Sequence, residues 1–284
     1  MTGPFAPAIH FLSDYGTADE FAGVVRAVLH RHAPGTPVID LTHQVPHFDV
    51  AAGAAALVRA APYLGPGAVL AVVDPGVGTA RRGVAIRVVG VAGPDSDPGG
   101  ARPGPEWWVG PDNGLLVPAV ESLGGAASVN VLDKGAGTTF DGRDVFAPAA
   151  AQLVTGSDPA SLGPGVDPAS LIRLPTPPPD HFEGGVLVTS VTHIDSFGNT
   201  QLRAGPEDLN RLDVQVGSLV EVELASGQTV DAKRVEAFGD LGRGEFGMLV
   251  DGNGHLALVL DRSSAADHLG LDGFVHPVRL RRSG

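Results

Sequence analysis

The chain has 284 residues, of which 43% are hydrophobic and 18% charged, so it can bury a sizeable core and is long enough for two domains. Its formal net charge of −13 disfavours nucleic acid and anionic membrane surfaces as partners, because both require a basic footprint. The absence of cysteine excludes disulfides, thiolate zinc sites and a cysteine nucleophile.

The N-terminal residues lack the pattern of a secretion signal. No basic segment precedes a long apolar run there, so we expect no signal peptide. No uninterrupted apolar stretch reaches the ~18 residues that indicate a membrane span. We therefore expect a cytoplasmic protein without a membrane partner.

The first part of the chain alternates between apolar runs typical of strands and segments with helical apolar spacing. In chain order we predict strand 8–13, helix 18–32, strand 38–41, helix 50–61, strands 68–73, 84–89 and 107–109, a turn into a helix at 110–116, and helix 146–154. This alternation predicts an α/β N-terminal domain, residues 1–173, with a mostly parallel sheet and helices on both faces. The Pro/Gly-rich residues 91–106 are predicted to be a surface insertion.

A Pro-rich linker is predicted at residues 174–185, because consecutive prolines exclude helix and central strand. Beyond it, short β-like runs are separated by Gly, Asp and Ser, namely 186–193, 219–224, 229–235, 246–251 and 255–260. They predict a small all-β, barrel-like C-terminal domain, residues 186–284. The R-L-R-R run at 279–282 is interpreted as a solvated tail.

Clusters of polar residues follow several of these apolar runs. They are S-D-Y-G-T-A-D (13–19), V-D-P-G-V-G-T-A-R (73–81), G-P-D-N-G (110–114), F-D-G-R-D-V-F-A-P (140–148) and I-D-S-F-G-N (194–199). Any one of them could be an ordinary Asp-Gly turn. Ligands of open α/β sheets bind beyond the carboxyl ends of the strands, where Asp74 follows a buried run and where a flexible loop can return Arg81 to it.

The order of these motifs resembles the S-adenosylmethionine hydroxide adenosyltransferase family, which is related to fluorinases and chlorinases. The resemblance implies an N-terminal α/β domain and a C-terminal β domain. It also implies a homotrimer, with the active site between the N-domain of one subunit and the C-domain of the next. The implied reaction is hydrolysis of S-adenosyl-L-methionine (SAM) at C5′ to adenosine and L-methionine, with SAM as substrate and no cofactor.

The resemblance assigns the catalytic roles to three residues. Asp74 matches the carboxylate that activates water, and Arg81 matches an arginine that would fix Asp74 and stabilise hydroxide-like charge. Asp141 stands where the family pattern usually has a histidine, in F-D-G-R-D. An ionised Asp accepts hydrogen bonds but does not donate them, so we interpret the three residues as an acid–Arg–acid relay.

In the N-terminal domain, the resemblance implies three contacts to the substrate. Asp14 would bind the ribose diol, and Asp19 would hold the methionine ammonium group. Phe48 stands where relatives place an aromatic ring against the nucleoside, and a core phenylalanine is the alternative.

In the C-terminal domain, Asp195 would hold the same ammonium group, and Phe197 and Asn199 would bind adenine by stacking and hydrogen bonding. Ser263 belongs to a loop whose backbone would bind adenine. Asn253 is matched to a methionine carboxylate contact, although D-G-N-G (251–254) departs from the Asn-Ser pattern usual there.

Two other functions stay open. A non-catalytic SAM- or adenosine-binding protein is compatible with Asp141 in place of histidine. A halogenase is disfavoured by Asp74, whose charge would repel halide, and by Val77 and Gly142, which replace the hydroxyl residues of fluorinases. No His spacing indicates a metal site, and His43, His47 and His193 are interpreted as loop or core residues.

Overall fold

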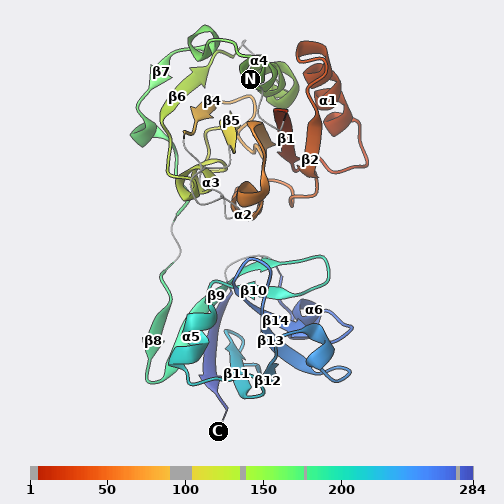
Figure 1. Ribbon diagram of the computed structural model, residues 1–284, viewed down its shortest axis with the longest axis vertical. Coiled ribbons are helices and arrows are strands. Elements are labelled where there is room, and N and C mark those ends of the chain that lie inside the picture. The colour runs from red at the N-terminus through yellow and green to blue at the C-terminus, as the bar shows by residue number, and fades with distance from the viewer. Residues whose placement is uncertain (1–5, 90–103, 135–138, 176–177, 273–275, 284) are drawn as a thin grey trace. The chain divides into compact units, whose positions relative to one another are not determined.

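The computed structural model describes residues 6–89, 104–134, 139–175, 178–272 and 276–283. The chain divides into two compact units, Met1–Pro175 and Thr176–Gly284 (Figure 1). The division falls within the segment predicted to be a linker. Most of the predicted insertion at 91–106 lies outside the described residues. No helix in the described ranges is long and apolar enough to cross a membrane.

The first unit contains a seven-stranded sheet. Its spatial order is β2 (Val38–Thr42), β1 (Ala8–Ser13), β3 (Gly67–Val72), β5 (Pro105–Pro111), β4 (Gly83–Arg87), β6 (Ser128–Leu132) and β7 (Gly165–Val166). Pairing is parallel from β2 to β5 and antiparallel from β5 to β7. Helical crossovers connect β1, β2 and β3, as parallel neighbours require, whereas a loop joins β3 to β4. The α/β class is confirmed, with a mixed sheet.

Helices cover both faces of this sheet, as predicted. Helices α1 (Phe21–His32) and α4 (Ala147–Val154) pack together, and α4 contacts β1, β3 and β5. Helix α2 (Val50–Ala60) packs on α3 (Val117–Ser122). On β3, Leu70 and Val72 belong to the core on the α4 side, whereas Val73, just past the strand, faces Gly53 of α2. The alternation of side chains along a strand therefore places the two helix pairs on opposite faces.

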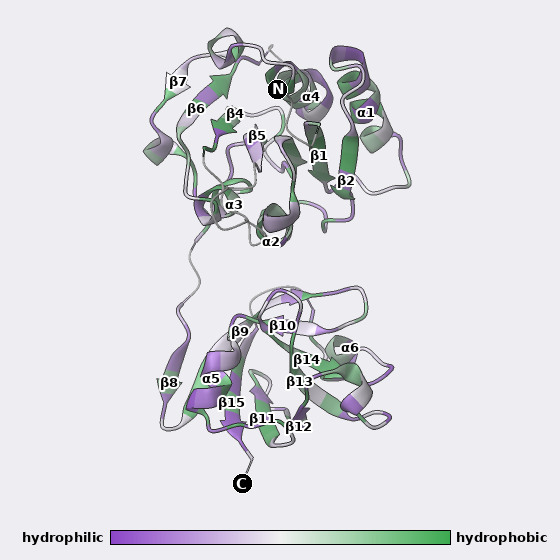
Figure 2. Ribbon diagram, in the orientation of Figure 1, coloured by the Kyte–Doolittle hydropathy of each residue, from purple (hydrophilic) through white to green (hydrophobic). Residues whose placement is uncertain are grey.

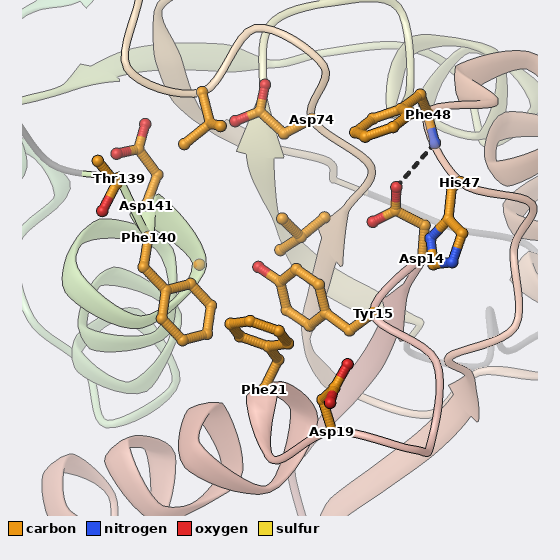
Figure 3. Close-up of a pocket in the computed structure, with 13 residues that line it drawn as sticks. Asp14, Tyr15, Asp19, Phe21, His47, Phe48, Asp74, Thr139, Phe140 and Asp141 are labelled. Atoms are coloured by element: carbon orange, nitrogen blue, oxygen red, sulfur yellow. Dashed lines mark hydrogen bonds between the residues drawn. The ribbon is translucent and has the colours of Figure 1, made fainter.

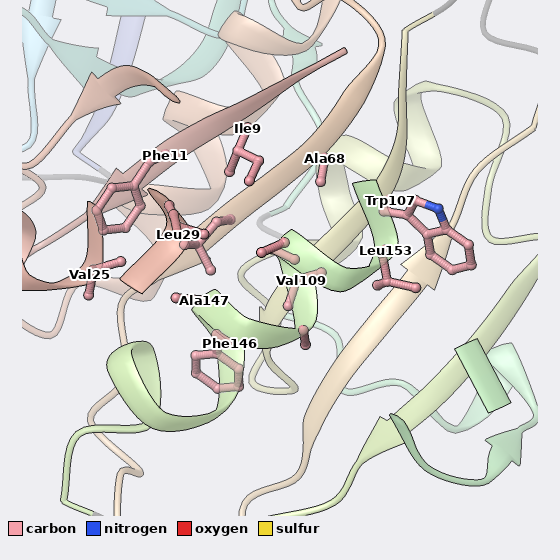
Figure 4. Packing of buried hydrophobic residues seen from close by; sticks show 14 of the residues in the cluster. Ile9, Phe11, Val25, Leu29, Ala68, Trp107, Val109, Phe146, Ala147 and Leu153 are labelled. Atoms are coloured by element: carbon pink, nitrogen blue, oxygen red, sulfur yellow. The ribbon is translucent and has the colours of Figure 1, made fainter. Parts of the chain in front are cut away.

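The core beneath α1 and α4 fixes the strand that carries the first polar cluster. Val25 and Leu29 of α1 are four residues apart and lie on the same helix face, where they join Ile9 and Phe11 of β1 in one cluster (Figure 4). Every residue of β1 is buried, and the strand is largely hydrophobic in Figure 2. The cluster includes Phe146, from a π-helical turn (Gly142–Phe146) that leads directly into α4.

The second unit is a closed barrel, which confirms the barrel-like prediction. The seven strands, in spatial order, are β10 (Thr200–Leu202), β14 (Leu256–Leu260), β13 (Phe246–Val250), β12 (Thr229–Arg234), β11 (Leu219–Leu224), β15 (Pro277–Arg282) and β9 (Val186–Ile194). The pairing of β9 with β10 closes the ring, and β8 (His181–Glu183) pairs with β9 outside it. Helices α5 (Pro206–Arg211) and α6 (Ala265–Leu269) complete the unit.

The interpretation of residues 279–282 as a solvated tail is wrong, because they belong to β15. This strand is largely hydrophilic in Figure 2, yet Val278 and Leu280 are buried in the barrel core. Arg279 and Arg281 alternate with them and form ion pairs with Glu223 and Glu221. A two-residue period thus places the arginines outside and the apolar side chains inside, which a count of charges does not reveal.

Candidate active site

A pocket of about 350 Å³ lies at the carboxyl ends of the parallel strands of the first unit, where the sequence predicts a site (Figure 3). Its walls come from Asp14 and Tyr15 after β1, from Phe48 before α2, from Asp74 after β3, and from residues 139–142 at the start of the π-helical turn. We call this cavity the Asp74 pocket. Segments far apart in the sequence therefore meet at one sheet edge.

A short loop returns Arg81 to Asp74. In the turn after β3, the Val77 backbone N–H donates to the Asp74 carbonyl at 3.3 Å. The Thr79 hydroxyl donates to the Gly76 carbonyl at 2.7 Å and accepts from the Arg81 backbone N–H at 3.2 Å. Gly76 leaves room for this return, since a Cβ there would lie 3.3 Å from the Arg81 Cβ. The Pro-Gly-x-Gly motif thus accounts for the contact expected from the sequence.

Asp74, Arg81 and Asp141 form one buried ionic cluster. Arg81 Nε donates to Asp74 Oδ1 at 3.0 Å, and Nη2 donates both to Asp74 Oδ2 and, at 2.7 Å, to Asp141 Oδ2. The side chains of Asp74, Arg81 and Asp141 are 6%, 7% and 1% exposed. The structure therefore brings together the three residues to which catalytic roles were assigned, and Arg81 bridges the two carboxylates.

The electrostatics of this cluster favour a stronger base than an ordinary aspartate. Burial raises the pKa of Asp74, and this effect outweighs the opposing attraction of Arg81; the negative charge of Asp141 raises it further. Lys134 supplies a second cation, with its Nζ 3.7 Å from Asp141 Oδ2 and donating to the Arg81 carbonyl at 2.6 Å. A carboxylate with a raised pKa is more readily protonated, so Asp74 is suited to accept a proton.

Asp14 and Phe48 lie side by side in the wall of the Asp74 pocket (Figure 3). The Phe48 backbone N–H donates to Asp14 Oδ2 at 2.9 Å. Phe48 has φ +66° and its side chain is 69% exposed, so the alternative of a core phenylalanine is wrong. Asp19 is an exposed residue of the same pocket. The three residues predicted to contact substrate in the N-terminal domain are therefore all in the pocket wall.

The second unit has a separate pocket of about 660 Å³, lined by Asp195, Phe197, Asn199 and Ser263 among others. Asp195 Oδ1 accepts from the backbone N–H groups of Phe197 and Asn199, both at 2.9 Å. The Asn199 amide donates to Asp195 Oδ2 at 2.8 Å. Asn253 lies on the turn between β13 and β14 and lines neither pocket.

Sequence reasoning missed several aromatic residues of the Asp74 pocket. Tyr15, Phe21 and Phe140 line it and contact one another, with ring-centroid distances of 5.3 to 5.9 Å. Each belongs to or follows closely a polar motif that was recognised, and that position is the only sequence signal for them. His47, interpreted as a loop or core residue, also lines this pocket. Within the described ranges, no group of three or more His, Cys, Asp or Glu side chains is arranged to hold a metal ion.

Comparison with known proteins gives consistent matches along the chain. A protein of Salinispora tropica named (R)-S-adenosyl-L-methionine hydrolase is 42% identical over 278 residues, covering 93% of this chain and 94% of that protein. A fluorinase of an Actinoplanes species is 28% identical over 281 residues, covering 92% and 93%. A crystal structure of an uncharacterized conserved protein from Thermotoga maritima aligns with a TM-score of 0.83 at 28% identity, covering 96% of this chain and 100% of that one.

Family models match both units. Residues 9–163 match the SAM hydroxide adenosyltransferase N-terminal domain, and residues 189–274 match the C-terminal domain of the same family. Together these ranges include the Asp74 pocket and the pocket of the second unit. The chain belongs to the SAM hydroxide adenosyltransferase family.

Proposed function

We propose that this protein hydrolyses SAM, with water attacking C5′ of the nucleoside to give adenosine and L-methionine. The observation that carries the proposal is the buried Asp74–Arg81–Asp141 cluster, whose two carboxylates line the pocket. The relative named as a SAM hydrolase supports the choice of substrate and reaction.

The reaction requires a positioned oxygen nucleophile more than any other group. A sulfonium is already a good leaving group: as the new O–C5′ bond forms, the C5′–S bond breaks and its electron pair stays on sulfur as the neutral thioether of methionine. Asp74 takes a proton from the attacking water. Arg81 fixes the Asp74 carboxylate by two hydrogen bonds and joins it to Asp141. SAM is the substrate in this scheme, and the chemistry needs no additional cofactor.

Substrate binding is divided between the two pockets in this proposal. Asp14 accepts hydrogen bonds from the ribose diol, Asp19 attracts the methionine ammonium group, and Phe48 packs against the nucleoside. Asp195 binds the ammonium group as well, whereas Phe197 and Asn199 bind adenine by stacking and by the amide. In addition, the loop that contains Ser263 contacts adenine, and Asn253 contacts the methionine carboxylate.

The assembly that joins these two sets of residues is a further part of the proposal. We assign the protein to a homotrimer in which the Asp74 pocket of one subunit faces the pocket of the second unit, lined by Phe197 and Asn199, of the next subunit. Symmetric closure of such a head-to-tail arrangement gives three equivalent sites. Asp195 and Asn199 would then complete a site whose catalytic carboxylate belongs to the neighbouring chain.

Incubation with SAM in ¹⁸O-labelled water tests the reaction. Label should enter the 5′-hydroxyl of adenosine, with one methionine released for each adenosine. Asp74→Asn should lower the rate by about 10²- to 10⁴-fold, because the proton acceptor is lost. Asp272→Asn is the matched control, since the Asp272 side chain is fully exposed in the second unit.

Other products would contradict the proposal. Release of adenine or of homoserine lactone would show that a different bond is broken. Formation of a 5′-halo-nucleoside only in the presence of halide would indicate a halogenase, although the Asp74 carboxylate would repel an anion. Saturable binding of intact SAM without adenosine release would indicate a binding protein.

A further inference from the structure

Tyr15 places a phenol inside the Asp74 pocket. It follows Asp14 at the end of β1, and Figure 3 shows its hydroxyl pointing into the pocket interior. Three phenylalanine rings hold the tyrosine ring, with centroids at 6.5 Å for Phe11, 5.9 Å for Phe21 and 5.6 Å for Phe140. Two of these contacts, with Phe11 and Phe140, are edge-to-face, the arrangement that aromatic quadrupoles favour. The position of the hydroxyl is therefore fixed by packing.

The hydroxyl lies against the residue that follows Asp141. A Cβ built on Gly142 would come within 2.1 Å of the Tyr15 hydroxyl oxygen, so the oxygen occupies the space in which a side chain at 142 would begin. Among the described residues, no hydrogen-bond partner of this hydroxyl is found, and none is drawn in Figure 3. A rigid phenol with an unused donor thus lies beside the ionic cluster.

The ionic cluster is rich in acceptors and has few donors to spare. Carboxylates accept hydrogen bonds only, and both Asp74 and Asp141 line the pocket. Arg81 directs Nε and Nη2 to these carboxylates, and Nη1 donates to the Arg82 carbonyl at 3.0 Å. A water molecule there can donate both of its hydrogens to carboxylates, but one of its two lone pairs must face C5′. The other lone pair needs a separate donor if the water is to be held in one orientation.

Tyr15 remains a donor over the whole working range of pH. Burial raises the pKa of its phenol, and the negative charges of Asp14, Asp74 and Asp141 raise it further, to well above the usual value. The hydroxyl therefore keeps its proton wherever Asp74 is ionised and able to act as a base.

We infer that the Tyr15 hydroxyl donates a hydrogen bond to the attacking water and orients it, so that its free lone pair is directed at C5′. This role rests on the proposed SAM hydrolysis and adds a residue to it. The proton of the phenol is not transferred: Asp74 accepts the proton that the water loses, and Tyr15 fixes the geometry of attack. Tyr15 is thus a catalytic residue in the sense that it touches the reacting oxygen.

Removal of this one oxygen tests the inference. Tyr15→Phe keeps the ring and its aromatic contacts, so the fold should be retained. We expect kcat to fall by about 10- to 100-fold with KM for SAM changed by less than about twofold, since water is misplaced while substrate contacts remain. The chain has only two tyrosines, and Tyr63 is 64% exposed, so Tyr63→Phe is a matched control that should leave both constants unchanged.

The outcomes separate the two hypotheses. If the wild-type protein hydrolyses SAM and Tyr15→Phe retains its kcat, the Tyr15 role is overturned and the proposed function stands. If Tyr15→Phe raises KM at unchanged kcat, the hydroxyl contacts substrate instead of water, which also overturns it. If the wild-type protein releases no adenosine, both hypotheses fall.

Titration of the Tyr63→Phe protein tests where the phenol lies, because burial and the three neighbouring carboxylates together should keep it protonated. Tyr15 is then the sole tyrosine, and its ultraviolet ionisation signal should appear only above the pH at which an exposed tyrosine ionises. Ionisation at an ordinary pKa would show that the phenol is not held beside the carboxylates and would overturn the placement of the donor.

Discussion

The strength of Asp74 as a base depends on the charged side chains that surround it, Arg81 and Asp141. Burial and Asp141 raise its pKa, while Arg81 lowers it, and the net direction is upward. In the proposed mechanism the ionised carboxylate is the active form, so activity should be lost as the pH falls through this raised pKa. The acidic limb of kcat/KM against pH should therefore lie above the ~3.9 of an ordinary aspartate.

Asp141→Asn tests how much Asp141 contributes to the raised pKa of Asp74, because asparagine has the shape of aspartate without its charge. Removal of the negative charge takes away one contribution that raises the pKa of Asp74, so the acidic limb should move to lower pH. The rate should fall at the plateau because the relay is interrupted. The measurement is the pH–rate profile of the wild-type and Asp141→Asn proteins. An acidic limb at the same pH in both would mean that Asp74 is not the titrating group.

Substitutions at Gly142 and Tyr15 should have non-additive effects on the free energy of unfolding, because Gly142 leaves space for the Tyr15 hydroxyl. A methyl group at 142 would lie 2.1 Å from the Tyr15 hydroxyl and 3.2 Å from its Cζ. Gly142→Ala should thus destabilise the protein by about 1–3 kcal/mol through overpacking.

In a Tyr15→Phe background, the same Gly142→Ala change should cost clearly less, since the clashing oxygen is gone. Denaturant unfolding of the two single variants and the double variant measures the coupling. Additive losses would show that the two residues do not meet as described.

At the scale of elements, β15 lies within the barrel and pairs with both β11 and β9. Leu280→Ala removes a fully buried side chain and should cost about 2–5 kcal/mol in the unfolding of the second unit. Arg281→Ala breaks a partly exposed ion pair with Glu221 and should cost less than about 1 kcal/mol. Circular dichroism during urea unfolding compares the two, and equal losses would contradict the assignment of inner and outer faces.

The sequence predicts those elements whose apolar pattern is regular. The strand at 8–13 and the strand at 219–224 are found with the bounds expected. Apolar residues predominate in the first, and apolar residues alternate with Glu221 and Glu223 in the second. Strand β6 has no counterpart among the predicted elements. It has only five residues, one of them a buried Asn130, and only the structure shows that this amide donates to the Gly163 carbonyl. Strand β10 has three residues and depends on its neighbours for its pairing.

The site was predictable to the extent that it lies in contiguous motifs. Asp74 and Arg81 belong to one loop, and the Gly-rich turn between them already indicates a return of the chain. Tyr15 has no such local signal, because its position depends on Gly142, which comes from a distant segment. The contact of a side chain with a glycine from a distant segment is a property of the fold, and no periodic pattern in the sequence indicates it.

At the scale of the whole molecule, a shared active site predicts complementation between inactive variants. Asp74→Asn subunits lack the proposed base, and Asn199→Ala subunits lack the proposed adenine contact, so each homotrimer should be impaired. Mixed trimers formed by unfolding and refolding the two together in equal amounts should regain about a quarter of the wild-type sites, since some sites then draw both halves from intact units.

Activity of the mixture after refolding, compared with that of separately refolded variants, is the measurement. No recovery in verified mixed oligomers would place both sets of residues of each site in the same chain. Sedimentation analysis of the wild-type protein tests the trimer itself, and a monomeric active enzyme would contradict it.

Phe48 has a left-handed backbone conformation, which is energetically unfavourable for a residue with a side chain. A non-glycine residue in this conformation costs about 1–2 kcal/mol, and here the bent peptide also supplies the N–H that holds Asp14. Glycine at 48 would adopt the same bend freely, so Phe48→Gly should raise the melting temperature while weakening adenosine binding. Under the proposed nucleoside contact, thermal stability and nucleoside affinity would therefore be opposed at this one position.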